Sequence, residues 1–375
     1  MVFLDRPAES LDELFDRERE VAQLASAVKD RAAVLVVGFR RAGKTSLVKA
    51  ATGGGPRVYI DVRAFEDRGY VTYDDFLTLL SKSLAPLLPR YKRLGELLKG
   101  VRGVNVAGVG VEFERGREAP RFVELLEALD RLGEERGERV VLILDEAQEL
   151  AKMRGRTLLP VLAYAYDNLR HLSIVYTGSK VGLLARFLRL SDPESPLFGR
   201  YLERIEVAPF SRDLSLRYLE EGFAAAGVKV ENKILEEAVD VFDGIVGWLA
   251  HFGLRALRSP QTAVQETLSY AVQVAESEFC RFVEYMGSQR YVYVVKLAAH
   301  GARWSEVKRY LAAVEGRRIT DAEVTKLLKN LVDYGFLEKR GDLYAVADPV
   351  LRRAAAELKC RTTRAPWTSA LTPPC

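Results

Sequence analysis

The chain has 375 residues, 48% of them hydrophobic, and a formal net charge of +4 at pH 7. This length is typical of two or three domains, and the apolar content excludes a globally disordered chain. The small net charge excludes a protein whose whole surface binds polyanions. Residues 290–360 hold 14 basic and 9 acidic side chains, so a modest basic bias lies near the C-terminal end.

The cysteines and the N-terminus indicate in which cellular compartment the protein is expected. Cys280, Cys360 and Cys375 have no metal-binding or redox spacing, and we expect them to be reduced thiols in the cytosol. The N-terminus, MVFLDRPAES, contains acidic residues and lacks the apolar core of a signal peptide. Apolar runs are shorter than the roughly 18 residues of a membrane helix. These observations predict a cytoplasmic protein without a membrane partner.

Short apolar runs alternate with helical patterns over the first part of the chain. The runs predict β-strands at 33–37, 58–62, 139–144, 172–177 and 202–207. The segments with helical periodicity are 45–51, 74–99 and 120–135, and the alternating residues 101–114 predict an inserted hairpin. Strands that alternate with helices predict an α/β fold with a parallel five-stranded sheet covered on both faces.

The pattern changes after Pro209. Residues 213–288 are predicted to form several helices, which we interpret as a lid. Three helical segments (290–300, 304–314 and 321–334) then precede two short strands around Gly341, which is the order of a winged helix. The predicted division is a P-loop core at 1–209, a helical lid at 210–288, a winged helix at 289–360 and a disordered tail at 361–375.

A phosphate-binding motif lies between the first predicted strand and the following helix. The segment GFRRAGKTS, residues 38–46, fits G-x-x-x-x-G-K-[ST] without a mismatch. Backbone N–H groups of such a loop bind phosphate oxygens, Lys44 is expected to reach the β- and γ-phosphates, and the Thr45 hydroxyl is expected to bind Mg²⁺. The predicted nucleotide-binding residues are Gly38, Phe39, Arg40, Arg41, Ala42, Gly43, Lys44, Thr45 and Ser46.

A second motif supports the first. The segment VVLILDEAQ, residues 140–148, is an apolar strand that ends in two acids. Asp145 is expected to hold Mg²⁺ through water, and Glu146 is expected to polarise the attacking water. The alternative is a strand followed by a solvated Asp-Glu cap, which the preceding P-loop makes improbable.

Three further residues are candidates for catalysis. Thr177 and Ser179, in the segment YTGS, end the fourth predicted strand and are expected to contact the γ-phosphate or the water. Ser179 as a helix cap is the alternative. Arg200 precedes the fifth strand and is a candidate arginine finger, in cis or from a neighbouring subunit, with a surface ion pair as the alternative. Arg40 and Arg41 either contact phosphate or face solvent.

Together, GFRRAGKTSL, LDEAQ and SPLFGR resemble the archaeal ATPase family, which belongs to the STAND group of P-loop NTPases and is related to AAA+ proteins. The resemblance covers roughly residues 10–350. The segment LFDREREVAQL, residues 14–24, resembles the group's adenine-packing box, with Arg17 in the Arg position and Asp16 where Gly is usual. The segment DGIVGWL, residues 243–249, resembles the lid motif, with Val246 where Pro is usual.

The resemblance implies a strand order of 5-1-4-3-2, with an acid on the strand beside the P-loop strand. It also implies that ATP is bound in preference to GTP. Asp16 and Arg17 are thereby added to the predicted nucleotide-binding residues.

The predicted winged helix carries exposed basic candidates. Lys326 and Lys329 lie on its third helix, and Lys339 and Arg340 lie on the wing. In helix-turn-helix proteins this helix enters the major groove of double-stranded DNA. Winged helices also dock on proteins, so DNA and a protein partner both stay open.

Three functions remain. The first is a slow ATPase that converts ATP and water to ADP and phosphate, and whose nucleotide state switches the lid and the winged helix. The second is a nucleotide-binding regulator with little hydrolysis. The third is a DNA-binding initiator resembling archaeal Orc1/Cdc6 proteins, with Arg255 as the candidate lid arginine. The oligomeric state is left open.

Overall fold

The computed structural model describes residues 3–108 and 110–360, so the predicted disorder of residues 361–375 lies outside the described part. The chain divides into two compact units. Unit 1 comprises Met1–Gly227 together with Ile245–Ala250, and unit 2 comprises the remaining described residues. The segment predicted as a separate lid is therefore shared between the units, and a lid at 210–288 stays a prediction.

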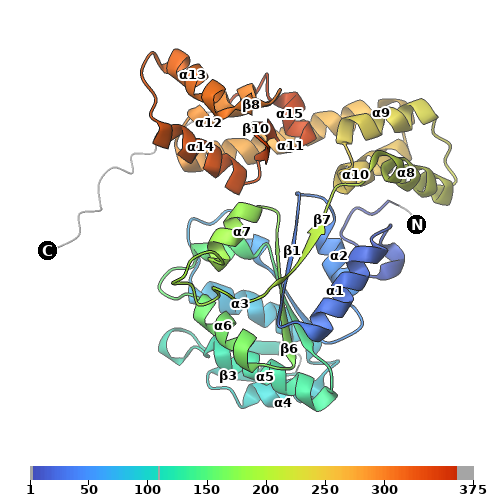
Figure 1. The fold of residues 1–375 in the computed structure, drawn as a ribbon. Coiled ribbons are helices and arrows are strands. Elements are labelled where there is room, and N and C mark those ends of the chain that lie inside the picture. The colour runs from blue at the N-terminus through green and yellow to red at the C-terminus, as the bar shows by residue number, and fades with distance from the viewer. Residues whose placement is uncertain (1–2, 109, 361–375) are drawn as a thin grey trace. The chain divides into compact units, whose positions relative to one another are not determined.

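Unit 1 is built on a parallel five-stranded sheet with helices on both faces (Figure 1). Its strands are β1 (Ala33–Gly38), β2 (Arg57–Asp61), β5 (Val140–Asp145), β6 (Leu172–Gly178) and β7 (Glu203–Val207). The strand order β2-β5-β6-β1-β7 confirms the predicted order 5-1-4-3-2. However, β6 lies between β1 and β5, so the expectation that the acidic strand adjoins the P-loop strand is wrong.

Two apolar cores cover the two faces of this sheet. Side chains alternate across a strand, so Leu142 and Leu144 join one core while Val141 and Ile143 join the other. The helices of unit 1 are α1 (Glu18–Asp30), α2 (Lys44–Ala51), α3 (Tyr73–Leu84), α4 (Lys92–Lys99), α5 (Phe122–Arg136), α6 (Leu159–Asn168), α7 (Val181–Leu188) and α8 (Arg212–Ala226). Short 3₁₀ turns occur at Leu11–Glu13, Val62–Phe65, Ala85–Leu87, Gly116–Glu118 and Ala147–Lys152.

The helical pattern predicted over residues 74–99 is interrupted in the structure. Helix α3 ends at Leu84, and α4 begins at Lys92. Pro86 and Pro89 lie in the break, where each lacks the N–H group that a continuous helix would need. The predicted hairpin is confirmed as β3 (Val104–Ala107) and β4 (Gly110–Phe113), which pair antiparallel.

Unit 2 contains the predicted winged helix. Its helices are α9 (Asn232–Phe242), the part of α10 (Val246–Ala256) from His251 onward, α11 (Pro260–Met286), α12 (Arg290–Ala298), α13 (Trp304–Glu315), α14 (Asp321–Asp333) and α15 (Pro349–Ala354). Strands β8 (Ala302–Arg303), β9 (Leu337–Arg340) and β10 (Leu343–Val346) form an antiparallel sheet in the order β8-β10-β9. The two-residue strand β8 was not predicted because it is too short to show a periodicity.

A disulfide bond joins Cys280 on α11 to Cys360 after α15. The expectation of reduced thiols is therefore wrong for this pair. The two cysteines are 80 residues apart in sequence, so their spacing carried no sign of the contact. Intracellular proteins of hyperthermophiles commonly contain disulfides, so the bond does not itself identify an oxidising compartment. Within the described residues, no helix is long and apolar enough to cross a membrane.

Candidate active site

The loop between β1 and α2 approaches β7 closely. A Cβ atom on Gly38 would lie 2.2 Å from the carbonyl oxygen of Val207, so a larger residue does not fit without moving that strand. Gly43, at the N-cap of α2, has a φ of 96°, which a residue with a Cβ rarely adopts. The two glycines of the motif therefore allow the loop to turn into the N-terminus of α2, whose partial positive charge favours phosphate.

The Lys44 side chain folds back over this loop. Its ammonium nitrogen donates to the carbonyl oxygens of Gly38 (3.0 Å) and Phe39 (2.7 Å), and the residue is only 5% exposed. Burial lowers the pKa of Lys44, while the charges of Glu146 and Asp145 oppose that effect. Lys44 thus lies at the phosphate loop with both acids of the second motif close enough to act on its charge.

Asp145 is fully buried at the carboxyl end of β5 and accepts hydrogen bonds from three hydroxyl groups. Oδ2 accepts from Thr45 at 2.9 Å and from Tyr59 at 2.5 Å, while Oδ1 accepts from Thr177. The structure therefore joins the predicted metal-binding pair, Thr45 and Asp145. A hydroxyl beside a carboxylate is a donor set of hard oxygens, which suits Mg²⁺ in the presence of phosphate oxygens. The phenol of Tyr59 was not predicted.

Glu146 follows the strand in a left-handed conformation, with a φ of 55°. Such a conformation is costly for a residue with a side chain and is concentrated at functional sites. One carboxylate oxygen, Oε2, accepts from Gln148 Nε2 (2.6 Å), from the Ser179 hydroxyl (2.8 Å) and from the Ser179 backbone N–H (3.1 Å). Burial raises the pKa of Glu146, but the Lys44 charge and these hydrogen bonds outweigh it, so the pKa lies below its ordinary value. Glu146 is therefore ionised and held through one oxygen.

The two residues predicted to contact the γ-phosphate or the water both contact the acids. The Thr177 hydroxyl donates to Asp145 and accepts from the backbone N–H of Glu146 (3.1 Å). Ser179 contacts Glu146 through both its hydroxyl and its N–H. Contact with phosphate stays a prediction for both. Gln148 was missed as a site residue, although its place in the LDEAQ motif was a signal.

The other residues of the phosphate loop have separate contacts. Arg40 pairs with Glu66 at 2.8 Å, and the guanidinium of Arg41 lies over the ring of Trp248. The Ser46 hydroxyl accepts the backbone N–H of Ala8 (3.1 Å), so it binds the N-terminal segment. Phe39 and Ala42 pack in the core on the α1 and α2 side of the sheet. Nucleotide contacts of these five residues stay predictions.

Asp16 and Arg17, from the predicted adenine box, both have left-handed backbones, with φ of 55° and 80°. Asp is one of the residues that tolerates this region, which explains how it replaces the usual Gly at position 16. The buried Arg17 guanidinium donates to the carbonyl oxygens of Ala208 (2.6 Å) and Ala42 (3.5 Å) and stacks on Phe210. Arg17 therefore joins the box to the phosphate loop and to the segment after β7.

Arg200 lies near the amino-terminal ends of the strands, whereas the phosphate loop follows the carboxyl-terminal end of β1. Val34 pairs with Glu203 and Gly38 pairs with Val207, so the start of β7 lies beside the start of β1. The two ends of the paired strands are four residues apart, which is roughly 13 Å. The Arg200 guanidinium binds Asp167 on α6 at 3.0 and 2.5 Å. In this arrangement Arg200 lies away from the phosphate loop of its own chain, and a role as an arginine finger stays a prediction.

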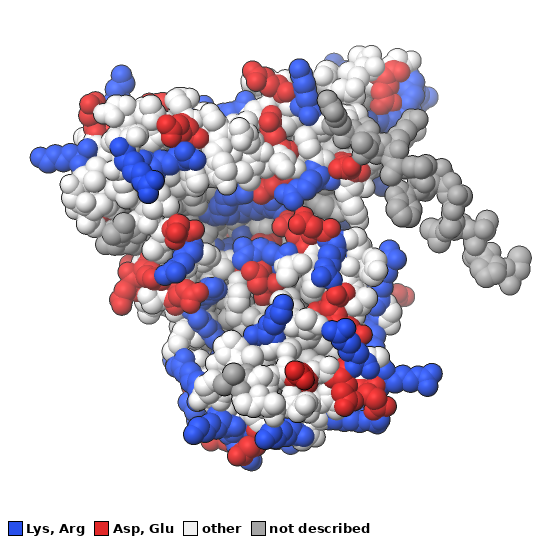
Figure 2. All heavy atoms as spheres, turned by 180° about the vertical axis from the view of Figure 1, so that it is seen from behind, with Lys and Arg blue, Asp and Glu red and all other residues white. Residues whose placement is uncertain are grey.

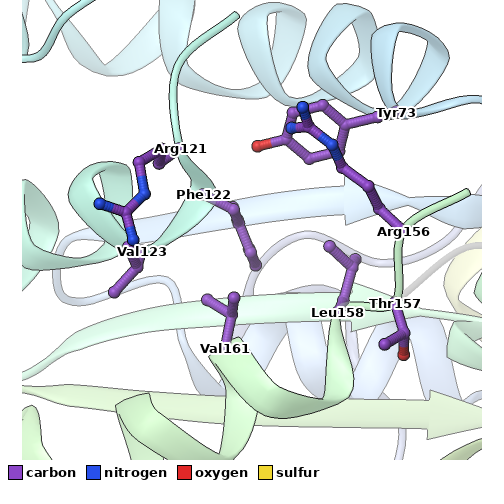
Figure 3. A pocket seen from close by; sticks show the side chains of 8 residues that line it. All are labelled: Tyr73, Arg121, Phe122, Val123, Arg156, Thr157, Leu158 and Val161. Carbon is purple, nitrogen blue, oxygen red and sulfur yellow. The ribbon is translucent and has the colours of Figure 1, made fainter.

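A cavity of 170 Å³ lies apart from the residues described above (Figure 3). Phe122, Leu158 and Val161 form its apolar floor, and the guanidinium of Arg156 lies 4.5 Å from the centroid of the Tyr73 ring. Its volume is below the range of about 300–1,000 Å³ typical of small-molecule sites, and none of its lining residues belongs to the phosphate loop. It is therefore distinct from the predicted nucleotide site.

Two family profiles match the chain. The profile of an ATPase domain found predominantly in Archaea matches residues 14–252. The chain belongs to this archaeal ATPase family. The profile of the C-terminal winged helix-turn-helix domain of MCM proteins also matches this archaeal ATPase, at residues 286–347. No curated protein sequence matches it significantly.

Solved structures extend the comparison over nearly the whole archaeal ATPase. The Walker-type ATPase PABY2304 of Pyrococcus abyssi is 33% identical, with a TM-score of 0.83 over 95% of this chain and 99% of that chain. The Aeropyrum pernix ORC2 protein in its ADPNP-ADP complexes is 17% identical, with a TM-score of 0.58 over 94% of each chain. Its ADP form is 15% identical, with a TM-score of 0.53 over 95% of this chain and 96% of that chain. The two ORC2 matches show a shared fold alone.

Proposed function

We propose that this archaeal ATPase binds ATP with Mg²⁺ at the phosphate loop and hydrolyses it slowly to ADP and phosphate. The observation that supports this most directly is the joining of Thr45 to Asp145 at 2.9 Å, with Lys44 and an ionised Glu146 beside them. A loop that binds phosphate, a hard-oxygen pair for the metal and a carboxylate for water are the parts that phosphoryl transfer requires.

Each residue has a distinct part in the proposed reaction. Lys44 exchanges its bonds with the carbonyls of Gly38 and Phe39 for phosphate oxygens, and its charge stabilises the charge on the transferred group. The backbone N–H groups of the loop orient the β-phosphate. Glu146 accepts a hydrogen bond from the attacking water through Oε1, because Oε2 is already occupied by Gln148 and Ser179.

The metal's residues follow from the same geometry. Thr45 and Asp145 would hold Mg²⁺, Thr45 through its hydroxyl and Asp145 through a bound water. When bound, Mg²⁺ neutralises charge on the phosphate oxygens. Thr177 keeps the carboxylate of Asp145 oriented from the neighbouring strand.

The test is ATP turnover measured as phosphate release. We expect Lys44→Ala to lose nucleotide binding and turnover, and Glu146→Gln to keep binding but lose at least about a hundredfold in turnover. Glu134→Gln, at an exposed position on α5, is the matched control and should turn over like the wild type. Wild-type turnover that survives both site substitutions would refute hydrolysis at this site. Tight binding without turnover would instead favour the passive nucleotide-binding regulator.

We further propose that the nucleotide state acts as a switch of the STAND or AAA+ kind. The support is that the segment resembling the lid motif contacts the phosphate loop, since the Gly247 N–H donates to the Arg41 carbonyl at 3.0 Å. A switch requires an element that differs between nucleotide states. Limited proteolysis with ATP, with ADP and without nucleotide is the check, and identical cleavage patterns in all three would exclude a switch.

A second candidate function is binding of double-stranded DNA through the winged helix, as an initiator or otherwise. Lys326 and Lys329 are exposed on α14, and Lys339 and Arg340 are exposed on β9. Basic and acidic side chains are interspersed over the face seen in Figure 2, so the electrostatic attraction is moderate. Asp321 and Glu323 in the first turn of α14 reduce it further.

The DNA hypothesis is tested by duplex binding at several salt concentrations. We expect weak, salt-sensitive binding that Lys326→Ala with Lys329→Ala reduces, while Lys92→Ala with Lys99→Ala on α4 leaves it unchanged. If both double variants bind duplex DNA equally well, α14 is not the DNA-contacting helix. The remaining hypothesis is then a protein partner docked on the winged helix.

A further inference from the structure

Tyr59 lies on the same face of the sheet as the metal-binding pair. Strands β2 and β5 are parallel, and Tyr59 pairs with Ile143. Side chains two residues apart on a strand share a face, so Tyr59, Ile143 and Asp145 all face the α1 and α2 side. Asp145 is about 6.6 Å further along the sheet than Ile143, a separation that a long phenol spans and a short hydroxyl does not.

The Tyr59 phenol donates a hydrogen bond to Asp145. Its oxygen lies 2.5 Å from Asp145 Oδ2, the same oxygen that accepts the Thr45 hydroxyl. A phenol is a hydrogen-bond donor, and the Asp145 carboxylate is its acceptor here. Asp61, the nearest other acid on β2, is held by Arg63 at 2.8 and 2.6 Å and does not compete for the phenol.

The hydrogen bonds that join Tyr59, Asp145 and Thr45 leave lone pairs of the Thr45 hydroxyl available to a cation. Tyr59 and Thr45 both donate to the same carboxylate oxygen, Oδ2 of Asp145. Because Thr45 donates its proton to this fixed oxygen, its own lone pairs are free to bind a cation. Without the phenol, Oδ2 keeps Thr45 as its hydroxyl donor and Oδ1 keeps Thr177, so two contacts in place of three hold the carboxylate and its orientation toward Thr45 is less fixed.

We propose that Tyr59 is a positioning residue for Mg²⁺: it fixes Asp145 so that Thr45 and Asp145 present their oxygens to the metal together. This inference rests on the proposed function, because it assumes that the metal binds with nucleotide at this pair. Partners of this kind around a metal site typically change metal affinity about tenfold or more when they are removed.

The test measures ADP binding by calorimetry over a range of Mg²⁺ concentrations and in EDTA. We expect Tyr59→Phe to leave the affinity in EDTA within about twofold of wild type and to raise the half-saturating Mg²⁺ concentration about tenfold. Tyr73→Phe is the matched control, because its phenol donates to the Pro120 carbonyl at 2.8 Å, away from Asp145. It should have the wild-type Mg²⁺ dependence.

The outcomes separate the inference from the proposed function. An unchanged Mg²⁺ requirement in Tyr59→Phe, or an equal loss of affinity with Mg²⁺ and in EDTA, would overturn the positioning role. A wild-type protein whose ADP affinity ignores Mg²⁺ would overturn the proposed function itself. If Tyr59→Phe does not fold, 3-fluorotyrosine at position 59 keeps the shape with a stronger donor, and a raised Mg²⁺ requirement there would contradict the inference.

Discussion

The guanidinium of Arg41 lies over the indole ring of Trp248, with 4.4 Å between the guanidinium carbon and the ring centroid. Arg41 belongs to the phosphate loop, and Trp248 belongs to the segment that resembles the lid motif. The backbone adds a second link, because a Cβ atom on Gly247 would lie 2.8 Å from the Arg41 Cβ. The loop and this segment are therefore packed so closely that movement of one requires movement of the other.

We predict that nucleotide binding changes the fluorescence of Trp248. A phosphate that attracts Arg41 would draw the guanidinium from the ring and change the ring's surroundings. The measurement is tryptophan emission during titration with Mg²⁺ and ADP, with Trp248→Phe as the control in which the change should vanish. Unchanged emission, while calorimetry shows binding, would mean that Arg41 stays on the ring.

The Ser179 hydroxyl is predicted to assist catalysis through Glu146. Ser179→Ala removes one of two side-chain donors to Glu146 Oε2, so we expect turnover to fall about tenfold with little change in KM. Ser173→Ala, at a buried hydroxyl nearer the start of β6, is the control. A large rise in KM would show that Ser179 contacts the nucleotide directly.

The disulfide is predicted to stabilise unit 2. Closing a loop between cysteines 80 residues apart typically contributes about 2–4 kcal/mol, so reduction or Cys280→Ser should lower the free energy of unfolding of unit 2 by that amount. Cys375, which lies outside the described residues, gives the control Cys375→Ser. Thiol titration of the unfolded, unreduced protein should find one free thiol of the three cysteines. Three free thiols would contradict the bond.

Unit 2 should also lose stability in acid through Glu323. The backbone N–H and hydroxyl of Thr320 and the Arg290 guanidinium hold the pKa of Glu323 at about 2, below its ordinary value of 4.5. A lowered carboxyl pKa stabilises the folded state above pH 4.5, and that stabilisation is lost as the pH falls from 4.5 toward 2. The melting temperature of Glu323→Gln should be lower than that of the wild type at neutral pH, and it should depend less on pH in this range. Glu236→Gln, at an exposed position on α9, is the control, and equal pH profiles would refute the assignment.

Arg200 is predicted to matter only between subunits. Arg200 lies near the amino-terminal ends of the strands of its own sheet. Arg200→Ala should therefore reduce turnover only under conditions in which light scattering shows that subunits assemble. Mixing Arg200→Ala with Lys44→Ala should then restore part of the activity, since one chain supplies the arginine and the other the intact site. A loss of turnover in a strictly monomeric preparation would contradict this prediction.

The local features of the archaeal ATPase followed from the sequence. Apolar runs predicted the five strands of the sheet, and the G-x-x-x-x-G-K-[ST] and LDEAQ motifs predicted which residues form the phosphate loop and the acidic strand end. The winged-helix order of α12, α13 and α14 followed in the same way. These features depend on residues that are neighbours in sequence, and helix periodicity, strand alternation and turn chemistry act over that range.

The tertiary structure decided which distant side chains meet. Register on the sheet brings Tyr59 to Asp145, places Thr177 between the strands of the two motifs and leaves Arg200 at the far edge. The disulfide joins cysteines that no spacing rule connects. Such contacts depend on strand order and on a register in which a shift of one residue turns a side chain to the other face. The sequence by itself therefore determined the five strands of the sheet and the phosphate loop, whereas the pairing of strands decided which groups surround Asp145.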